Sequence, residues 1–208
     1  MAAGEHESSL GAVSDEIRRA SSDEVMLLAR PLAVAFFDDP VFSWVAPDEG
    51  RRRKMLLPLF ELFAEMLVGH DESYLAGDFA AALWAAPDRP TVPEQEADAF
   101  GERLTEIAGS DSERLVEVAM LIDEHHPPGT YYYLQFLGVV PERQGQGVGS
   151  AMLSHVLGRS DREGVAAFLD ATSPRNRALY ERHGFRTTNE LRVAGGPTLW
   201  QMYREPKT

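Results

Sequence analysis

The residues best suited to chemistry lie in a glycine loop in the C-terminal half of the chain. Residues 131–140 are almost all aromatic, branched or Leu, which predicts a buried strand, and an apolar stripe at helical spacing follows at residues 152–157. Between the two lie Gly145, Gly147 and Gly149. Glycines before a helix let backbone N–H groups approach a ligand, and the helix dipole favours an anion there. The order strand, glycine loop, helix therefore predicts a site for a phosphate-bearing ligand.

Two common phosphate-binding loops fit this pattern poorly. A P-loop needs a Lys before its Ser or Thr, whereas Ser150 directly follows Gly149. A dinucleotide-binding fold would place its third glycine where Ser150 stands and an acidic residue after the next parallel strand. Asp170 lies near the right distance, but the N-terminal half lacks a repeated βαβ pattern. Nucleotide hydrolysis and dinucleotide binding are therefore disfavoured.

Three linked motifs resemble one family. Residues 144–149 are similar to the Q/R-x-x-G-x-G/A loop of the GNAT superfamily of N-acetyltransferases, and residues 137–141 look like the strand that precedes that loop. Residues 173–185 resemble the family's Asn...Leu-Tyr-Glu-x-x-Gly-Phe segment. The region from residue 167 to residue 202 further resembles the puromycin N-acetyltransferase-like branch, whereas the N-terminal half is matched only loosely.

The resemblance implies a fold and a cofactor. The fold class is α/β (α+β), with a central mixed, mostly antiparallel sheet of about six to seven strands that splays at the cofactor site and is flanked by helices. The cofactor is acetyl-CoA, with its pantetheine along the strand and its pyrophosphate on the loop amides. The residues implied to bind it are Leu137, Val139, Val140, Arg143, Gln144, Gly145, Gln146, Gly147, Val148, Gly149, Ser150, Asn176 and Tyr180.

The same resemblance implies catalytic roles. Ser173 and Pro174 are typical of an N-cap and a first helical position, so Asn176 and Tyr180 share one helical face. The family pattern then makes Tyr180 the acid for the departing thiolate and Asn176 a hydrogen-bond partner of the pantetheine. The backbone N–H near Val139 is the expected donor to the oxyanion.

The general base stays open. In relatives with a Glu or His on the central strand, the equivalent positions are Tyr133 and Gln135, and neither is a base near neutral pH. Glu124, His125, His126 or a water chain leading to a carboxylate are the other candidates. The chain has no cysteine, which favours direct attack of the amine in a ternary complex over a cysteinyl intermediate.

An acceptor pocket is expected where the first predicted helix ends. Aromatic side chains there suit an apolar body, and carboxylates suit an ammonium group, although two aspartates before Pro40 are explained equally well as turn residues. The residues expected to contact the acceptor are Phe36, Asp38, Asp39, Trp44 and Tyr132.

Periodicity predicts the elements that must position these residues. Helices are expected over residues 25–37 (with Ser22 as N-cap), 49–68, 94–108 and 111–124, and a hairpin over residues 73–76 and 79–86. Gly158 is expected to end the helix after the glycine loop. Residues 1–14 are predicted to be a disordered tail and residues 15–208 a single acetyltransferase domain.

Composition narrows the function further. The net charge of −13 argues against a nucleic-acid partner, and no apolar stretch predicts a membrane span or a leader, so a cytoplasmic location is expected. Residues 1–130 hold 10 basic and 26 acidic residues, whereas residues 131–208 hold 10 and 7. This division suits a cationic acceptor in the first part and an anionic cofactor in the second. No metal site is expected, and the chain is expected to be a monomer or homodimer.

The leading hypothesis is an acetyl-CoA-dependent N-acetyltransferase for a small-molecule primary amine, such as an aminonucleoside or another amine antibiotic, with a role in antibiotic resistance. A protein N-terminal or lysine acetyltransferase, and a non-catalytic acyl-CoA sensor, are the alternatives.

Overall fold

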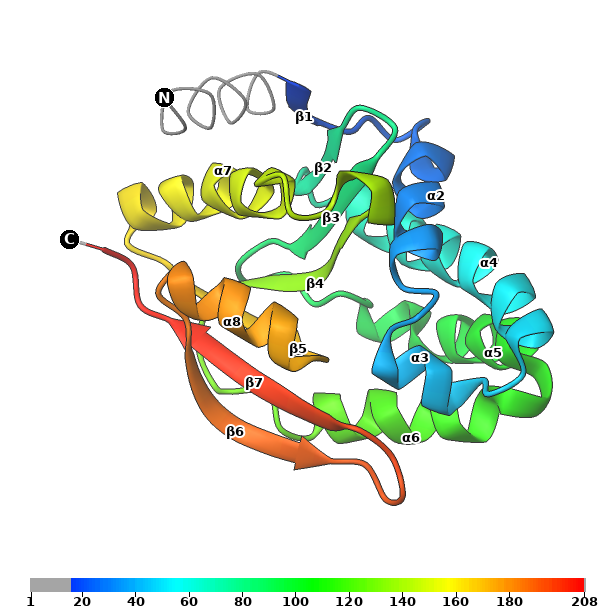
Figure 1. Ribbon diagram of the computed structural model, residues 1–208. Coiled ribbons are helices and arrows are strands. Elements are labelled where there is room, and N and C mark those ends of the chain that lie inside the picture. The colour runs from blue at the N-terminus through cyan, green and yellow to red at the C-terminus, as the bar shows by residue number, and fades with distance from the viewer. Residues whose placement is uncertain (1–15, 208) are drawn as a thin grey trace.

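The computed structural model describes residues 16–207, so the predicted tail lies outside the described residues. These residues form a seven-stranded sheet in the order β1-β2-β3-β4-β5-β7-β6 (Figure 1). The strands are β1 (Ile17–Arg19), β2 (Ser73–Ala76), β3 (Ala80–Ala85), β4 (Tyr131–Val139), β5 (Ala166–Ala171), β6 (Arg186–Arg192) and β7 (Thr198–Arg204). Within this sheet β4 and β5 are parallel and the other neighbours are antiparallel. The predicted class, a mixed and mostly antiparallel sheet flanked by helices, is confirmed.

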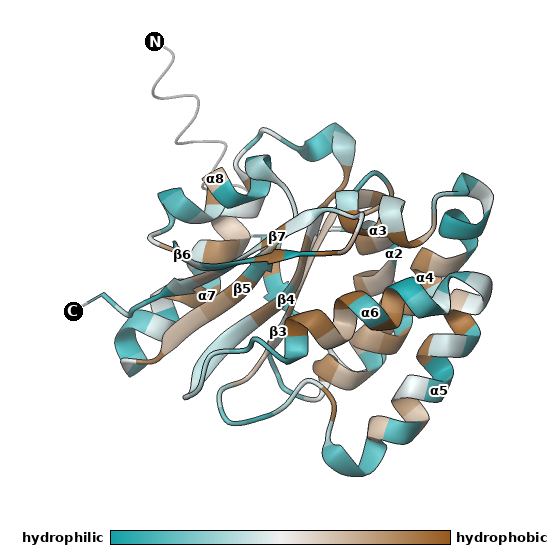
Figure 2. Ribbon diagram, turned by 90° about the horizontal axis from the view of Figure 1, so that it is seen from below, coloured by the Kyte–Doolittle hydropathy of each residue, from teal (hydrophilic) through white to brown (hydrophobic). Residues whose placement is uncertain are grey.

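Helices cover both faces of the sheet. The α-helices are α2 (Val25–Ala35), α3 (Pro40–Val45), α4 (Glu49–Val68), α5 (Ala97–Ala108), α6 (Ser112–Asp123), α7 (Val148–Glu163) and α8 (Pro174–Arg182). Short 3-10 turns are η1 (Glu94–Glu96), η2 (Gly109–Asp111) and η3 (Pro141–Arg143). Figure 2 shows that these helices carry both hydrophobic and hydrophilic residues, as expected for helices packed on one side. Within the described residues, no helix is long and apolar enough to cross a membrane.

The alternation of side chains along β3 separates two hydrophobic cores. Ala81, Leu83 and Ala85 face a core built with α2 to α6, whereas Ala82 and Trp84 face a second core built with α7 and α8. Successive residues of a strand point to opposite faces, so β3 is buried on both sides. The glycine loop and α8 therefore lie on one face, and α2 to α6 on the other (Figure 1).

Several predicted elements match the structure closely. Helix α4 has the predicted bounds and continues through Pro58, with the Asp48 side chain accepting a hydrogen bond from the Arg51 amide at its start. The β2–β3 hairpin is confirmed, and Gly77 has the positive φ of 52° that this tight turn requires.

Three local predictions were wrong. Ser22 is not the N-cap of α2, because Glu24 occupies that position. Gly158 does not end the helix after the loop; α7 continues to Glu163, and Gly164, with a φ of 68°, is its C-cap. Helix α3 was not expected, because Asp39 and Pro40 were interpreted as an end, whereas Asp39 is the N-cap of α3 and Pro40 its first residue.

The central strands separate part of the way along their length. Strand β4 pairs with β5 only from Tyr131, opposite Ala166, to Leu134, opposite Leu169, although β4 continues beside β3 to Val139. A bulge at Gln135 shifts the β3–β4 register and marks the same point. The sheet is therefore open between β4 and β5 from residue 135 onward, as the resemblance implied.

Gly138 allows α2 to lie directly on β4. A Cβ atom at this position would come within 2.9 Å of side-chain atoms of Leu32 and Ala35 and within 3.3 Å of the Leu32 Cα. The contact holds α2 against the open half of the strand, and with it the chain that leads into α3.

Candidate active site

The open edge of β4 presents backbone groups toward the gap. The Val140 amide donates to the Phe79 carbonyl at 2.9 Å, so Val140 faces β3. Because backbone groups alternate along a strand, Val139 and Leu137 direct their N–H groups the other way, into the gap. Two of the three predicted backbone positions are thus placed for a ligand, whereas the Val140 amide is already used, and the Val140 carbonyl accepts from the Arg143 amide at 3.0 Å.

The glycine loop ends in a helix N-terminus without a side-chain cap. Gly147, with a φ of 84°, is the N-cap of α7, and Gly145 also has a positive φ, of 74°. Among the described residues no side chain caps α7, and the first turn of α7 holds no acidic residue, so the amides of Val148, Gly149 and Ser150 are left for another acceptor. The positive end of the helix dipole favours an anion at this position.

The other predicted loop residues support the shape of the loop. The Gln144 side-chain amide donates to the Val139 carbonyl at 2.9 Å, and Gln146 donates to the Glu142 carbonyl at 3.0 Å. The Arg143 guanidinium lies 4.1 Å from the centre of the Phe79 ring, beside the loop. Gly149 has ordinary helical geometry, and an added Cβ would meet Leu179 at 3.5 Å, so backbone conformation does not explain that glycine.

Helix α8 brings two predicted residues to the gap. The Ser173 side chain accepts from the Asn176 amide at 3.2 Å and Pro174 is the first helical residue, as predicted from their types. Asn176 and Tyr180, one turn apart, both line one cavity. Burial, together with the nearby charge of Asp39, raises the pKa of Tyr180 above its ordinary value. The phenol therefore stays protonated at neutral pH and can donate a hydrogen bond.

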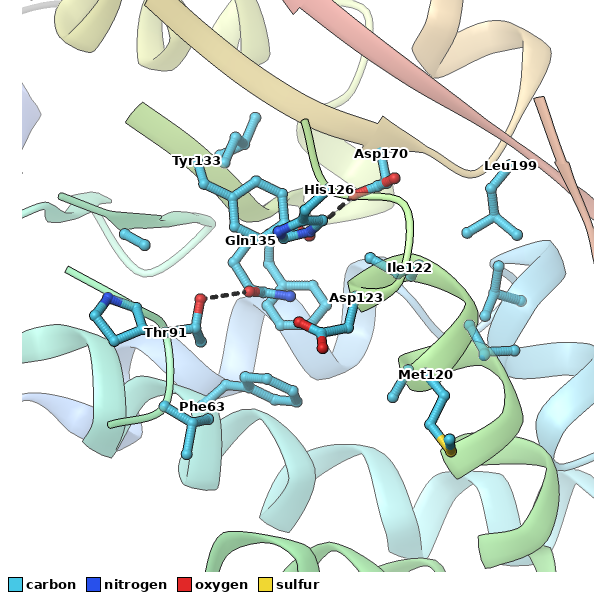
Figure 3. Close-up of a pocket in the computed structure, with 18 of the residues that line it drawn as sticks. Phe63, Thr91, Met120, Ile122, Asp123, His126, Tyr133, Gln135, Asp170 and Leu199 are labelled. Atoms are coloured by element: carbon cyan, nitrogen blue, oxygen red, sulfur yellow. Dashed lines mark hydrogen bonds between the residues drawn. The ribbon is translucent and has the colours of Figure 1, made fainter. Parts of the chain in front are cut away.

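This cavity, of about 780 Å³, lies between the sheet and the helices α4, α5 and α6 (Figure 3). Aromatic rings form much of its wall: the Phe136 ring meets Phe36 edge to face at 5.7 Å and Phe63 at 4.9 Å between ring centres. The aromatic lining residues are Phe36, Phe42, Phe63, Phe100, Tyr131, Tyr133, Phe136 and Tyr180. The carboxylates that line it are Asp88, Asp123 and Asp170, and Arg89 is the cation among its described lining residues. The cavity suits an apolar body that carries a positive charge.

The structure brings one of the five predicted acceptor residues to this cavity. Phe36 lines it. Tyr132 points to the opposite face of the sheet, where its hydroxyl donates to Glu163, because Tyr131 and Tyr133 take the cavity side of β4. The Trp44 indole donates to the Gly195 carbonyl at 3.0 Å, and Asp38 is exposed. None of these three is among the residues that line the cavity in the described part of the chain.

Asp39 is a structural group beside the cavity. It is 8% exposed, and one carboxylate oxygen accepts from the amides of Val41 and Phe42 at 2.9 and 3.4 Å. The other oxygen accepts from the hydroxyl of Thr172, which lines the cavity. Burial raises the pKa of Asp39, although these hydrogen bonds offset part of the increase.

Sequence reasoning passed over Asp170 as a site residue. It stands in the otherwise apolar strand β5 and lines the cavity, and the Tyr133 hydroxyl donates to its Oδ2 at 2.9 Å (Figure 3). His126, an earlier candidate for the base, also lines the cavity, with its ring edge to face against Tyr133 at 4.7 Å. Burial lowers the pKa of His126. A single carboxylate in a buried strand was the available signal.

Known proteins are similar to this chain in sequence and in fold. Residues 68–185 match the model of the acetyltransferase (GNAT) family. An uncharacterized N-acetyltransferase of Schizosaccharomyces pombe is 24% identical over 211 residues, which cover 92% of this chain and 83% of the relative. A solved Corynebacterium glutamicum protein, described as histone acetyltransferase HPA2 and related acetyltransferase, is 25% identical with a TM-score of 0.66, covering 92% of this chain and 96% of its own.

A further solved structure shares the fold at lower identity. Arylalkylamine N-acetyltransferase 2 from Aedes aegypti superposes with a TM-score of 0.65 at 16% identity, covering 92% of this chain and 98% of its own. The family match extends over more than half of the chain and includes the open strand, the glycine loop and α8. The chain therefore belongs to the GNAT family of acetyltransferases.

Proposed function

We propose that this protein transfers the acetyl group of acetyl-CoA to the primary amine of a small molecule, by direct attack in a ternary complex. The observation that carries the proposal is the position of Tyr180. It lines the aromatic cavity together with Leu137 of the open strand and Asn176 of α8. An acetyl donor along β4 and an acceptor in the cavity would therefore meet at one hydroxyl.

The residues present fit acetyl-CoA. The outward N–H groups of Leu137 and Val139 offer an added-strand partner for the pantetheine amides. The uncapped amides at the start of α7 suit the pyrophosphate, because three N–H groups and the helix dipole converge there. Arg143, beside the loop, can add a charge-assisted contact to a phosphate. When bound, acetyl-CoA supplies a thioester whose carbonyl carbon accepts the amine.

The chain's own groups then act on the developing charges. The Val139 amide is the donor that we assign to the oxyanion. Tyr180 donates its hydroxyl hydrogen to the departing sulfur and is protonated for this task over the whole neutral range, since its pKa is raised. Asn176, one helical turn away, faces the same cavity and holds the pantetheine in line.

The acceptor is a cationic amine with an apolar or aromatic body. Phe36, Phe63 and Phe136 provide the apolar wall, and the cavity carboxylates attract an ammonium group. The Aedes aegypti neighbour is described as an arylalkylamine N-acetyltransferase, which agrees with an aromatic amine but shares only the fold. An aminonucleoside antibiotic, as the puromycin N-acetyltransferase-like resemblance suggests, is one such amine.

Fewer observations support the two alternative functions, a protein acetyltransferase and a sensor of acyl-CoA. A protein lysine or N-terminal acetyltransferase agrees with the description of the Corynebacterium glutamicum neighbour. A cavity walled by aromatic rings, however, suits a compact body better than an extended peptide. A sensor of acyl-CoA without turnover would not need the buried Tyr180 at the meeting point of the two sites.

Thiol release from acetyl-CoA tests the proposal with four acceptors: 2-phenylethylamine, puromycin, putrescine and a lysine-containing peptide. We expect turnover with an aromatic amine and weak turnover with putrescine, which has no aromatic body, or with the peptide. Preference for the peptide would support the protein acetyltransferase. Acetyl-CoA binding without thiol release from any acceptor would support the sensor and overturn the proposal.

A further inference from the structure

Asp170 stands where the two central strands separate. The last paired residues of β4 and β5 are Leu134 and Leu169, and Asp170 follows directly. It is the charged residue of β5, whose other members are Ala, Phe and Leu. Its side chain lines the aromatic cavity on the side of β5, close to the opening between the strands. A carboxylate is thus present at the place where an amine must pass to reach a thioester in the gap.

The carboxylate of Asp170 is held but not saturated. Its Oδ2 accepts from the Tyr133 hydroxyl at 2.9 Å. Its Oδ1 is buried and accepts no hydrogen bond from the described residues. Gln201, opposite Asp170 in the β5–β7 pairing, likewise has a buried Nε2 without an acceptor. Each carboxylate oxygen has two lone pairs, so Asp170 can accept from Tyr133 and Gln201 and still bind an ammonium group.

The surroundings of Asp170 contain no nearby cation among the described residues that line this side of the cavity. Tyr131 and Tyr133 face it from β4, Gln201 lies opposite it on β7, and Asp123 of α6 and His126 of the turn after α6 line the same cavity. Burial raises the pKa of Asp170 to about 6, and the hydrogen bond from the Tyr133 hydroxyl offsets part of that increase. A carboxylate without a cationic partner is suited to receive one from a ligand.

Two polar side chains of β4 near the opening already have hydrogen-bond partners. Tyr133 uses its hydroxyl to hold Asp170, and Gln135 accepts from the Thr91 hydroxyl at 3.0 Å (Figure 3). Asp170, on the neighbouring strand, lines the same cavity and keeps one oxygen without a hydrogen bond from the described residues.

We propose that Asp170 receives the ammonium group of the acceptor and takes its proton, and that Tyr133 is the positioning residue that orients this carboxylate. The inference rests on the proposed function. One N–H proton passes to Asp170 and later to solvent, and the nitrogen lone pair forms the new C–N bond as the C–S bond breaks. Tyr180 protonates the departing thiolate, and a second N–H proton from the nitrogen replaces the proton that Tyr180 gives up. The net change converts an ammonium ion and a thioester into an amide, a thiol and one released proton.

The test is the pH profile of kcat/KM for an accepted amine, measured from about pH 5 to about pH 10. In the wild type, kcat/KM should rise with pH up to about pH 6 and then level off, since the carboxylate must be ionised. In Asp170→Asn the rate depends on the small fraction of free amine, so kcat/KM should rise about tenfold per pH unit toward the pKa of the amine. Activity at high pH should therefore be rescued.

Three further variants test which residue causes the rise of kcat/KM at low pH, the acid limb of the profile. Tyr133→Phe removes a hydrogen bond to the charged carboxylate and should move the limb upward by roughly one pH unit without abolishing it. His126→Gln should keep the limb, and so should Asp123→Asn, a second carboxylate of the same cavity. Loss of the limb in His126→Gln instead of Asp170→Asn would overturn the proposal in favour of the histidine.

Two other results would also overturn it. One is an Asp170→Asn profile that follows the wild type at every pH. The other is an Asp170→Asn protein that binds acetyl-CoA normally yet gains nothing at high pH. If Asp170→Asn fails to fold, the Tyr133→Phe variant is sufficient as a test. An acid limb of its kcat/KM profile that does not shift would contradict the proposal. Failure of the wild type to acetylate any amine would instead reject the proposed function, which separates the two ideas.

Discussion

Tyr180 combines burial with access to the cavity. It is 7% exposed and packs edge to face on Phe185, with 6.0 Å between ring centres, and this packing restrains a ring that lines the cavity. This rigidity is what a positioned acid needs, because catalysis falls steeply when the donor is misplaced.

Replacement of Tyr180 by Phe tests this role. The ring and its packing remain, and the hydroxyl is lost. We expect kcat to fall by roughly 10²- to 10⁴-fold with acetyl-CoA affinity nearly unchanged, as is typical of general acid catalysis. Steady-state kinetics beside calorimetric binding of acetyl-CoA provide both quantities. Turnover within a few-fold of the wild type would make Tyr180 a packing residue.

Asp39 lies between two helices: it follows α2 and is the N-cap of α3. Its side chain caps α3 and binds Thr172, so Asp39→Ala should lower the free energy of unfolding by about 1–2 kcal/mol through loss of the cap. Asp39→Asn retains a capping oxygen and should lose less. Asp38→Ala, at the neighbouring exposed position, is the matched control in urea denaturation. Equal effects of the two alanine variants would contradict the capping role.

The glycine loop before α7 is the element whose sequence most directly predicts a ligand site. Gly147→Glu places a side chain at a φ of 84° and a negative charge at the uncapped start of α7. Both effects oppose a bound phosphate, so acetyl-CoA affinity should be lost in a folded protein. Gly158→Ala, inside the same helix where a Cβ would meet only Arg162 at 3.7 Å, is the control and should bind normally. Undiminished affinity in Gly147→Glu would remove the loop from the account.

The sequence predicted helices and turns well where the residues that determine an element lie within a few positions of it. The apolar stripe of α4, the Gly77 turn and the Ser173–Pro174 start of α8 are of this kind. The prediction at Asp39 was wrong because an Asp-Pro pair is compatible both with the turn after one helix and with the start of the next. Here Asp39 and Pro40 begin α3. A glycine inside α7 was taken for its end for a similar reason.

The site was predictable only in part, because half of it depends on contacts between distant segments. The loop and α8 are continuous motifs, so their residues could be named from the sequence. The Tyr133–Asp170 hydrogen bond depends on the register of the parallel β4–β5 pair, which no local pattern fixes. The same register, with the alternation along β4, turns Tyr132 away from the cavity.

At the scale of the whole molecule, Asp170 should couple stability to pH. Its pKa of about 6 in the folded protein exceeds the ordinary value for an aspartate, about 3.9, so the folded state binds more protons between these values. Stability contributed by this group is therefore lost as pH rises from about 4 to about 6. Relative to wild type, Asp170→Asn should gain about 2 kcal/mol across this window in urea denaturation. A constant difference between the two proteins would contradict the raised pKa.

The charge of the chain divides in the way that two substrates of opposite sign require. The acidic first part supplies α2 to α6 and part of the cavity wall, and the mildly basic second part supplies the loop, α7, α8 and the remainder of that wall. The two parts meet along β4, where the proposed cofactor site and the proposed acceptor site adjoin Tyr180. This arrangement favours simultaneous binding of both substrates.

The most direct measurement of the central claim is initial-rate kinetics in which acetyl-CoA and 2-phenylethylamine are varied together, with thiol release and the acetylated amine both quantified. We expect one thiol for each N-acetyl product and intersecting double-reciprocal lines, which indicate a ternary complex. Parallel lines would contradict direct attack. Thiol release without an acetylated amine, from this acceptor or from puromycin, would contradict amine acetylation itself.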